Sequence, residues 1–221
     1  MNKHHLLISG TGRAGTTFLM QSFTELGLDT GFAHAADGMH ACCRAGMEWP
    51  LKDIFTKSAP YVVKAPILAE RITEVLEAPE IVVDSMIIPI RELHAAAESR
   101  REVSRQAKRR GAPGGLWLTK KPRQQEAALA MQFHHLVHML TQHDVPVIWL
   151  HFPRLVRDAE YLFGKLRFAL PGKGYAEFAR AFQAVSRPEL VHEFKPKGAD
   201  KLSVLSRLGA WCRLERARAR G

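Results

Sequence analysis

Cysteine is scarce in this chain, and the cysteines present do not form a metal or disulfide framework. Cys42 and Cys43 are adjacent, and Cys212 stands alone near the end. Neither a disulfide scaffold nor a zinc site uses this spacing, so we expect structural thiols in a reducing compartment. His134 and His138 stand four residues apart, but no carboxylate or cysteine pattern accompanies them. We therefore expect no bound metal.

Long apolar runs are also absent. No stretch of the sequence approaches the length that a helix needs to cross a bilayer, so we expect no membrane span. Residues 1–5 lead directly into the first expected strand and leave no room for an apolar targeting segment. The sequence therefore predicts a cytoplasmic protein, built as one domain over residues 1–221 with its core at about residues 5–186.

Acidic residues are outnumbered by basic ones. The chain has 22 Asp and Glu residues against 32 Lys and Arg residues, which gives a formal net charge of +10. This excess requires a partner that carries negative charge. Much of it lies at residues 100–110 and in a basic tail at about residues 200–221. For the tail, a solvated or frayed helix end is a simpler interpretation than a nucleic-acid arm, so nucleic acid is not expected as a partner.

The most informative stretch begins with a short apolar run at residues 6–8, which predicts a buried parallel strand. A loop with three glycines follows, and then a helix with apolar residues along one side. Glycines let the backbone turn tightly and point successive N–H groups inward, and the helix amino terminus adds partial positive charge. Thr16 and Thr17 add hydroxyl donors. The sequence therefore predicts an anion site at this loop.

One residue distinguishes the loop from that of nucleotide hydrolases. The spacing from Gly10 to Gly15 fits the hydrolase pattern, but Thr16 stands where that pattern has lysine, and the cation lies earlier, at Arg13. A P-loop kinase or hydrolase acting on nucleotides or small molecules would need the missing lysine and a magnesium-binding acid. It is therefore a less favoured interpretation, as is a non-enzymatic, basic nucleic-acid-binding protein.

The run at residues 12–17 resembles the 5′-phosphosulfate loop of bacterial-type sulfotransferases that use 3′-phosphoadenosine 5′-phosphosulfate (PAPS). In that family a lysine or arginine, a small residue, a glycine and two hydroxyl residues stand in this order. The resemblance implies that Arg13 acts in catalysis, by neutralising charge on the leaving phosphate oxygen. It also implies that PAPS binds, and its product PAP forms, at Gly12, Arg13, Ala14, Gly15, Thr16 and Thr17.

A second motif follows the apolar strand expected at residues 81–90. Arg91 ends that strand, and Ser99 stands eight positions later on the next helix. Eight residues cover little more than two helical turns, so both side chains can share one face. The pair resembles the 3′-phosphate site of PAPS enzymes, although Leu93 stands where the family usually has a proline. The resemblance implies that Arg91 and Ser99 hold the 3′-phosphate. The basic run at residues 100–110 is either a solvated basic face, which is slightly favoured, or a surface that helps to hold PAPS or to attract an anionic acceptor.

Lys64 is a further candidate site residue. It ends a short apolar strand expected at residues 61–64 and is followed by Ala65 and Pro66. This order resembles a K-x-P segment that is frequent in the sulfotransferase superfamily. The resemblance implies that Lys64 contacts the sulfonate or the acceptor, with a surface lysine as the alternative.

The group that takes the acceptor's proton is expected in residues 32–50. This segment follows the first strand and helix and should pass over the carboxyl ends of the strands, where ligands bind in open parallel sheets. His34, Asp37 and His40 are the candidates for the base. Because a carboxylate base follows the loop arginine at a similar distance in a related branch of the superfamily, His34 comes first. An ordinary loop histidine is the alternative.

Alternating strand and helix signals predict the fold. We expect a single three-layer α/β domain, similar to P-loop nucleotide kinases, with a mostly parallel central sheet of four or five strands flanked by helices. Residues 152–162 also resemble a strand-to-helix segment late in sulfotransferase domains. The resemblance implies a sulfotransferase that moves a sulfonate group from PAPS to a hydroxyl or amine by in-line displacement. The acceptor would be a small molecule or a glycan.

Overall fold

The computed structural model of the chain describes residues 2–40, 45–56, 58–109, 115–192 and 194. Cys42, Cys43 and Cys212 lie outside these residues, as does the basic tail at residues 200–221.

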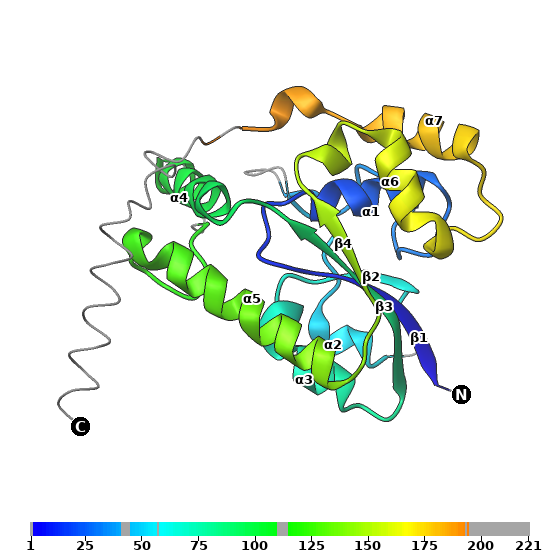
Figure 1. Cartoon of the computed structure of the whole chain (residues 1–221), viewed down its shortest axis with the longest axis horizontal. Coiled ribbons are helices and arrows are strands. Elements are labelled where there is room, and N and C mark those ends of the chain that lie inside the picture. The colour runs from blue at the N-terminus through cyan, green and yellow to red at the C-terminus, as the bar shows by residue number, and fades with distance from the viewer. Residues whose placement is uncertain (1, 41–44, 57, 110–114, 193, 195–221) are drawn as a thin grey trace, which may run out of the picture.

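A parallel sheet forms the centre of the described structure (Figure 1). Its strand order is β2-β1-β3-β4, and each neighbouring pair is parallel. The strands are β1 (Lys3–Ile8), β2 (Val62–Lys64), β3 (Ile81–Ile90) and β4 (Val147–His151). The helices are α1 (Thr16–Glu25), α2 (Leu51–Ile54), α3 (Leu68–Leu76), α4 (Leu93–Arg109), α5 (Gln125–Gln142), α6 (Ala159–Leu166) and α7 (Tyr175–Val185).

Alternation along β1 explains why helices cover both faces of the sheet. Successive side chains of a strand point to opposite faces. Leu6 and Ile8 pack in one apolar cluster with α1, α6 and α7, whereas Leu7 packs in another with α2, α3 and α5. All three side chains are fully buried. The two helix layers lie on opposite sides of the sheet in Figure 1, which gives the three-layer α/β fold expected from the sequence.

The direction of the chain crossovers reverses between β1 and β3. The chain leaves β1 through α1 and adds β2 on one side, and then crosses through α3 to add β3 on the other side of β1. Ligands of open parallel sheets bind outside the carboxyl ends of the strands at this kind of reversal. The glycine loop follows β1, and Arg91 follows β3. The topology therefore delivers both predicted motifs to the same edge of the sheet.

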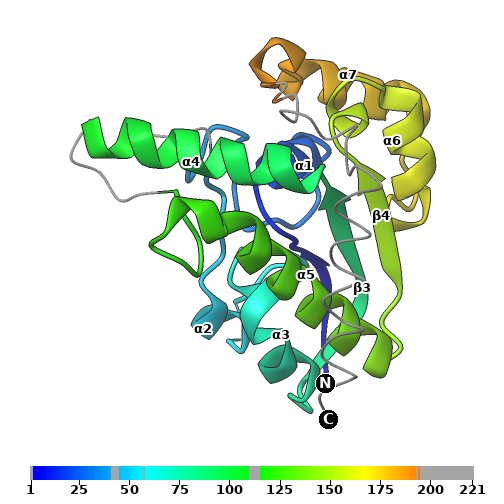
Figure 2. The same ribbon diagram turned by 60° about the vertical axis from the view of Figure 1, so that its left-hand side comes forward.

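The helix after β3, α4, projects from the body of the described structure (Figure 2). Helix α4 starts two residues after Arg91 and runs outward, past the layer that α5 and α3 form (Figure 2). Its first turns carry Ser99 and stay close to the glycine loop. No helix in the described ranges is long and apolar enough to cross a membrane.

Most element predictions are confirmed with small shifts of their ends. The sheet has four strands, β2 lies within the expected residues 61–64, and β3 matches the expected residues 81–90. A short 3-10 turn, Pro122–Gln124, leads directly into α5. Proline has no N–H to donate, so it is well tolerated in the first turn.

Candidate anion-binding site

The loop after β1 has an unusual backbone. Gly10, Gly12, Arg13 and Gly15 all have positive φ angles, and Arg13 has φ 57° although it carries a side chain. Consecutive residues near the left-handed region turn their N–H groups into a concave nest that favours anions. Helix α1 starts at Thr16, so its amino terminus adds partial positive charge to the nest. The local geometry therefore suits a phosphate or sulfate group.

Arg13 links the loop to the second predicted motif. Its Nε donates to the Ser99 hydroxyl at 3.2 Å, and its backbone oxygen accepts from Arg91 Nη1 at 3.0 Å. Ser99 is 86 positions away in sequence and Arg91 is 78. The structure thus brings Arg13, Arg91 and Ser99 together. The two motifs are parts of one site.

Arg91 carries a charge that no carboxylate in the described chain neutralises by contact. Its other donor, Nη2, bonds the backbone oxygen of His192, and its guanidinium lies over the rings of Phe152 at 4.8 Å and Phe194 at 5.5 Å. Burial and the positive charge of Arg13 lower the pKa of Arg91 to about 10. Arg91 is still a cation at neutral pH.

Arg100 is a site residue that the sequence analysis missed. It is 7% exposed, and its Nη2 and Nε both donate to the Thr11 carbonyl, at 2.6 and 3.3 Å. Its Nη1 donates to the Gly115 carbonyl at 3.2 Å. Burial and the charge of Arg13 lower the pKa of Arg100 to about 10, although Glu48 and Glu70 oppose the shift. A second buried cation therefore lies directly against the loop.

The position of Arg100 explains the need for glycine at residue 12. A Cβ atom there would lie 2.5 Å from Arg100 Nη2, and the φ of 69° also disfavours a side chain. The signal that could have found Arg100 is helical spacing. Ala96 and Ala97 stand four and three residues before Arg100 and are fully buried. Residues with this spacing share one face of a helix, so Arg100 lies on the inner face of α4.

Lys64 is buried, so the alternative of a surface lysine is wrong. Its side chain is 3% exposed and contacts the first turn of α1. Nζ donates to the Thr17 hydroxyl at 3.0 Å, to the Gly46 carbonyl at 2.6 Å and to Glu48 Oε1 at 3.4 Å. Lys64 thus ties three chain segments together next to the loop. Its contact with a sulfonate or acceptor stays a prediction.

The three candidate bases lie in a loop beside α1. The carboxylate of Asp37 accepts from the backbone N–H of His34 at 2.7 Å, and His34 is exposed. His40 is also exposed, and its backbone N–H donates to Ala45 at 2.8 Å. Within the described residues, no hydrogen bond joins these side chains to the glycine loop. Glu48, by contrast, is connected to the first turn of α1, directly after the loop: Lys64 Nζ donates both to the Glu48 carboxylate and to the Thr17 hydroxyl.

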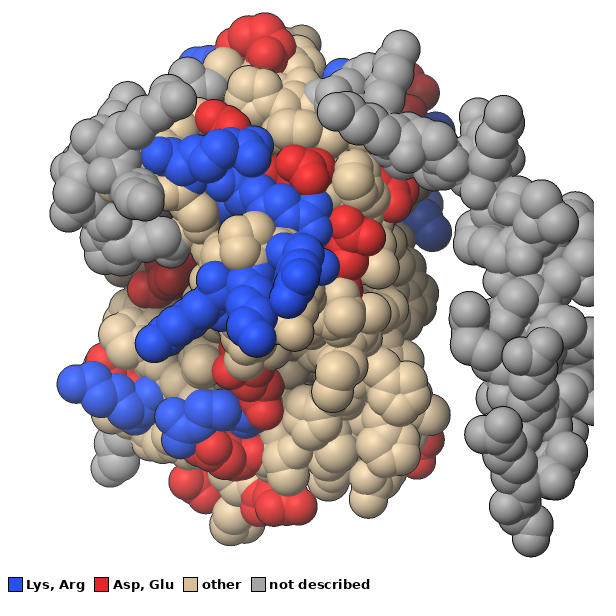
Figure 3. Space-filling view, turned by 90° about the vertical axis from the view of Figure 1, so that its left-hand side faces the viewer, with Lys and Arg blue, Asp and Glu red and all other residues tan. Residues whose placement is uncertain are grey.

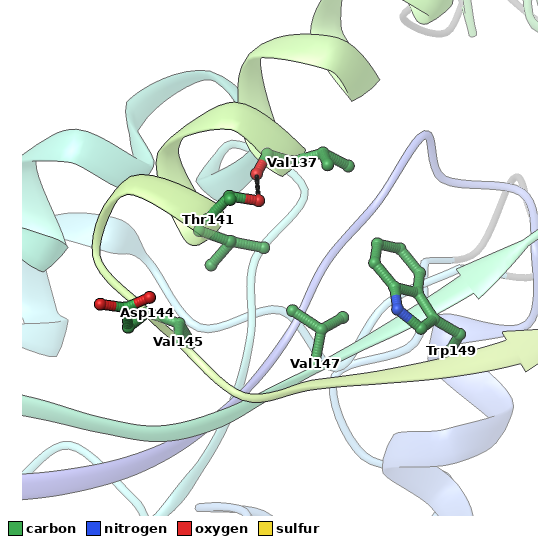
Figure 4. Close-up of a pocket in the computed structure, with 7 residues that line it drawn as sticks. Val137, Thr141, Asp144, Val145, Val147 and Trp149 are labelled. Carbon is green, nitrogen blue, oxygen red and sulfur yellow. Dashed lines mark hydrogen bonds between the residues drawn. The ribbon is translucent and has the colours of Figure 1, made fainter.

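A separate hollow lies away from the charged site, between α5 and the edge strand β4 (Figure 4). Its lining surface is about equally polar and apolar. Asp144 is its one charged residue, and the Thr141 hydroxyl bonds the Val137 carbonyl. The lining residues are Val137, Leu140, Thr141, Asp144, Val145, Val147 and Trp149. Nothing in this lining would hold an anion. The group of arginines at the glycine loop is therefore the better candidate for a functional site.

The described residues contain no group of three or more His, Cys, Asp or Glu residues placed to hold a metal ion. His134 and His138 stack with ring centroids 6.3 Å apart on α5, far along the chain from the loop. No family model, curated protein or solved structure matches the chain. Interpretation of the site therefore depends on its own geometry.

Proposed function

We propose that the protein is a sulfotransferase that moves a sulfonate group from PAPS to a hydroxyl or amine acceptor. The observation that carries the proposal is the meeting of Arg13, Arg91 and Arg100 at one glycine loop. Within the described chain, Arg91 and Arg100 bond only to carbonyl oxygens and face aromatic rings. Buried charges are normally paired, so these cations favour a ligand with several negative charges.

The arrangement also supports a ligand with two separate anionic ends. The nest at residues 10–15 suits the 5′-phosphosulfate, because its N–H groups and the α1 amino terminus converge there. Arg91 and Ser99 lie on the β3 and α4 side of Arg13 and suit the 3′-phosphate, through charge-assisted hydrogen bonds. An ordinary nucleotide has no 3′-phosphate and would leave that side without a partner.

Arg13 is the residue best placed to assist the displacement. In the proposed reaction the acceptor atom forms a bond to sulfur while the bond from sulfur to the 5′-phosphate oxygen breaks, and PAP leaves. Negative charge grows on the departing phosphate oxygen. A fixed guanidinium beside the loop stabilises that charge without having to reorient, which is the largest contribution in many group-transfer enzymes.

The test is transfer of labelled sulfonate from [35S]PAPS to 2-naphthol, a tyrosine peptide, an amine and a glycan, with water as a further acceptor. The proposal expects PAP release that depends on an acceptor. Turnover of magnesium ATP with no PAP release would instead favour a kinase or hydrolase. Steeply salt-dependent binding of oligonucleotides without affinity for PAP would favour a nucleic-acid-binding protein.

A further inference from the structure

Glu48 is the carboxylate that lies beside the glycine loop. Lys64 Nζ donates both to the Thr17 hydroxyl, at 3.0 Å, and to Glu48 Oε1, at 3.4 Å. Thr17 is the second residue of α1, directly after the loop. One buried ammonium group therefore connects Glu48 to the start of the helix that would hold the reacting phosphosulfate.

The backbone around Glu48 is held in place on both sides. The Trp49 N–H donates to the Lys64 carbonyl at 2.8 Å, which lines up residues 48–49 with the end of β2. Gly46 pairs with Met39 in an antiparallel bridge and accepts from Lys64 Nζ at 2.6 Å. Glu48 is thus carried by a fixed segment at the carboxyl end of the sheet. A base must be positioned in this way to act on one particular hydroxyl.

Glu48 keeps one side open to a ligand. Its side chain is 36% exposed, and Lys64 is its one hydrogen-bond partner in the described structure. Its negative charge also acts on Arg100, which bonds the loop at Thr11. The carboxylate is therefore held on one side by Lys64 and is partly exposed on the other, which leaves it accessible to an incoming group.

On the basis of the proposed function, we infer that Glu48 is the general base of the transfer. The acceptor O–H would give its proton to the Glu48 carboxylate as the acceptor oxygen forms its bond to sulfur. The bond between sulfur and the 5′-phosphate oxygen breaks in the same displacement, and PAP takes the electron pair. Glu48 then returns the proton to water. Lys64 is a positioning residue, because it holds both Glu48 and Thr17.

The sequence-based candidates fit this role less well. The Asp37 carboxylate accepts from the His34 backbone within its own loop, so this bond ties it to that loop and not to α1. Within the described residues, none of the three shares a hydrogen-bond partner with the start of α1. Glu48 shares Lys64 with it.

The test compares Glu48→Gln with Glu25→Gln, a matched change of an exposed carboxylate at the end of α1. Glutamine keeps an oxygen for Lys64 but cannot take a proton. Loss of a general base costs about 100-fold or more, so kcat for transfer from PAPS to 2-naphthol should fall by at least that factor. The Kd for PAP should stay within about 3-fold of the wild-type value, because the base does not hold the nucleotide. Glu25→Gln should match wild type in both.

The pH profile separates a base from a structural residue. Wild-type kcat should fall toward acid as the base becomes protonated, and Glu48→Gln should lose this limb. Glu48→Asp keeps the charge at a shorter reach and should recover part of the rate, and it provides a second variant if the glutamine protein folds poorly.

Several outcomes would overturn the inference. One is a Glu48→Gln protein with wild-type kcat and an unchanged acid limb. Another is a larger loss in His34→Gln than in Glu48→Gln, which would return the base to residues 32–40. A wild-type protein that does not bind PAP, or that binds it and releases none from PAPS to any acceptor, would instead reject the proposed function itself.

Discussion

Two neighbouring arginines on α4 have opposite environments. Arg100 points inward and bonds only the carbonyls of Thr11 and Gly115. Arg101 lies on the side of α4 away from the glycine loop, its outer side, where its side chain is 13% exposed. Its Nη1 meets Glu98 at 2.5 Å and its Nη2 meets Glu126 at 3.1 Å. The inner cation lacks an acidic partner in the described chain, and the outer one has two.

Other basic residues on the outer side of α4 also have acidic partners. Arg105 pairs with Glu102 at 2.8 Å, and Lys and Arg side chains gather on this side of the molecule with Asp and Glu side chains among them (Figure 3). Charge on that surface is partly balanced within the protein and is screened by water and salt. Within the described residues, Arg91 and Arg100 have no such acidic partner. A high net charge is therefore a poor guide to function until each cation's partner is known.

The largest difference between the two sides should appear in turnover. Arg13→Ala should lower kcat for PAPS by about 100-fold or more, because one preorganised charge at the leaving oxygen is worth that much in group transfer. Arg101→Ala should stay within about 3-fold of wild type. Acceptor-dependent PAP release measures both. Equal, small losses of kcat in the two variants would contradict the claim that only the inner arginines act in turnover.

The next effect should be on nucleotide affinity. Arg91→Ala should weaken PAP binding by about 10- to 100-fold, since a hydrogen bond to a charged group contributes about 1.5–3 kcal/mol. Binding of ADP should change less, because ADP has no 3′-phosphate. Calorimetry with both ligands measures the ratio, and a parallel loss for PAP and ADP would argue against a 3′-phosphate site at Arg91.

Arg100→Lys should have an intermediate effect. Lysine keeps the charge but lacks the planar fork that bridges Thr11 and Gly115. We expect PAP affinity to fall by about 3- to 10-fold, because the loop is held less firmly. The rise in Tm caused by saturating PAP should shrink accordingly. If PAP raised the Tm of the lysine variant as much as that of the wild type, Arg100 would contribute only its charge.

The smallest effect should come from the outer side. Burial alone would raise the pKa of Glu126, but hydrogen bonds from His94 and Arg101 outweigh it, and the net pKa is lowered. Its contribution to stability is therefore present above about pH 4.5 and is lost as pH falls through the folded-state pKa.

Glu126→Gln should accordingly flatten the acid fall of the unfolding free energy below about pH 4.5. The change should amount to less than about 1 kcal/mol, because the carboxylate is partly exposed. Urea unfolding at several pH values measures it. A steeper acid fall in the variant would contradict the sign, and a loss of PAP affinity at neutral pH would contradict the separation of the two sides of α4.

The sequence predicted the sheet, the loop and the second motif well because each depends on local patterns. The apolar run before Gly10, the glycines and the helix spacing all act within a few residues. Arg91 and Ser99 were predicted from their resemblance to the 3′-phosphate site of PAPS enzymes, and the structure brings them to Arg13. Their roles toward PAPS stay predictions.

Arg100 and Glu48 were missed because their environments are set by the tertiary structure. Arg100 is part of a basic run, and only packing against Thr11 separates it from Arg101. Glu48 lies in an irregular segment without periodicity, and its link to the loop passes through Lys64, 16 positions away. A hydrogen-bonding partner that distant cannot be inferred from neighbouring residues.

The most direct measurement is a calorimetric titration of the whole protein with PAP and with ADP under identical salt. The account predicts that PAP binds at least about 10-fold more tightly than ADP, because Arg91 and Ser99 would add a charge-assisted contact to the 3′-phosphate. Equal affinity for the two ligands, or no binding of PAP, would contradict the claim that the inner arginines form a site for a doubly phosphorylated nucleotide.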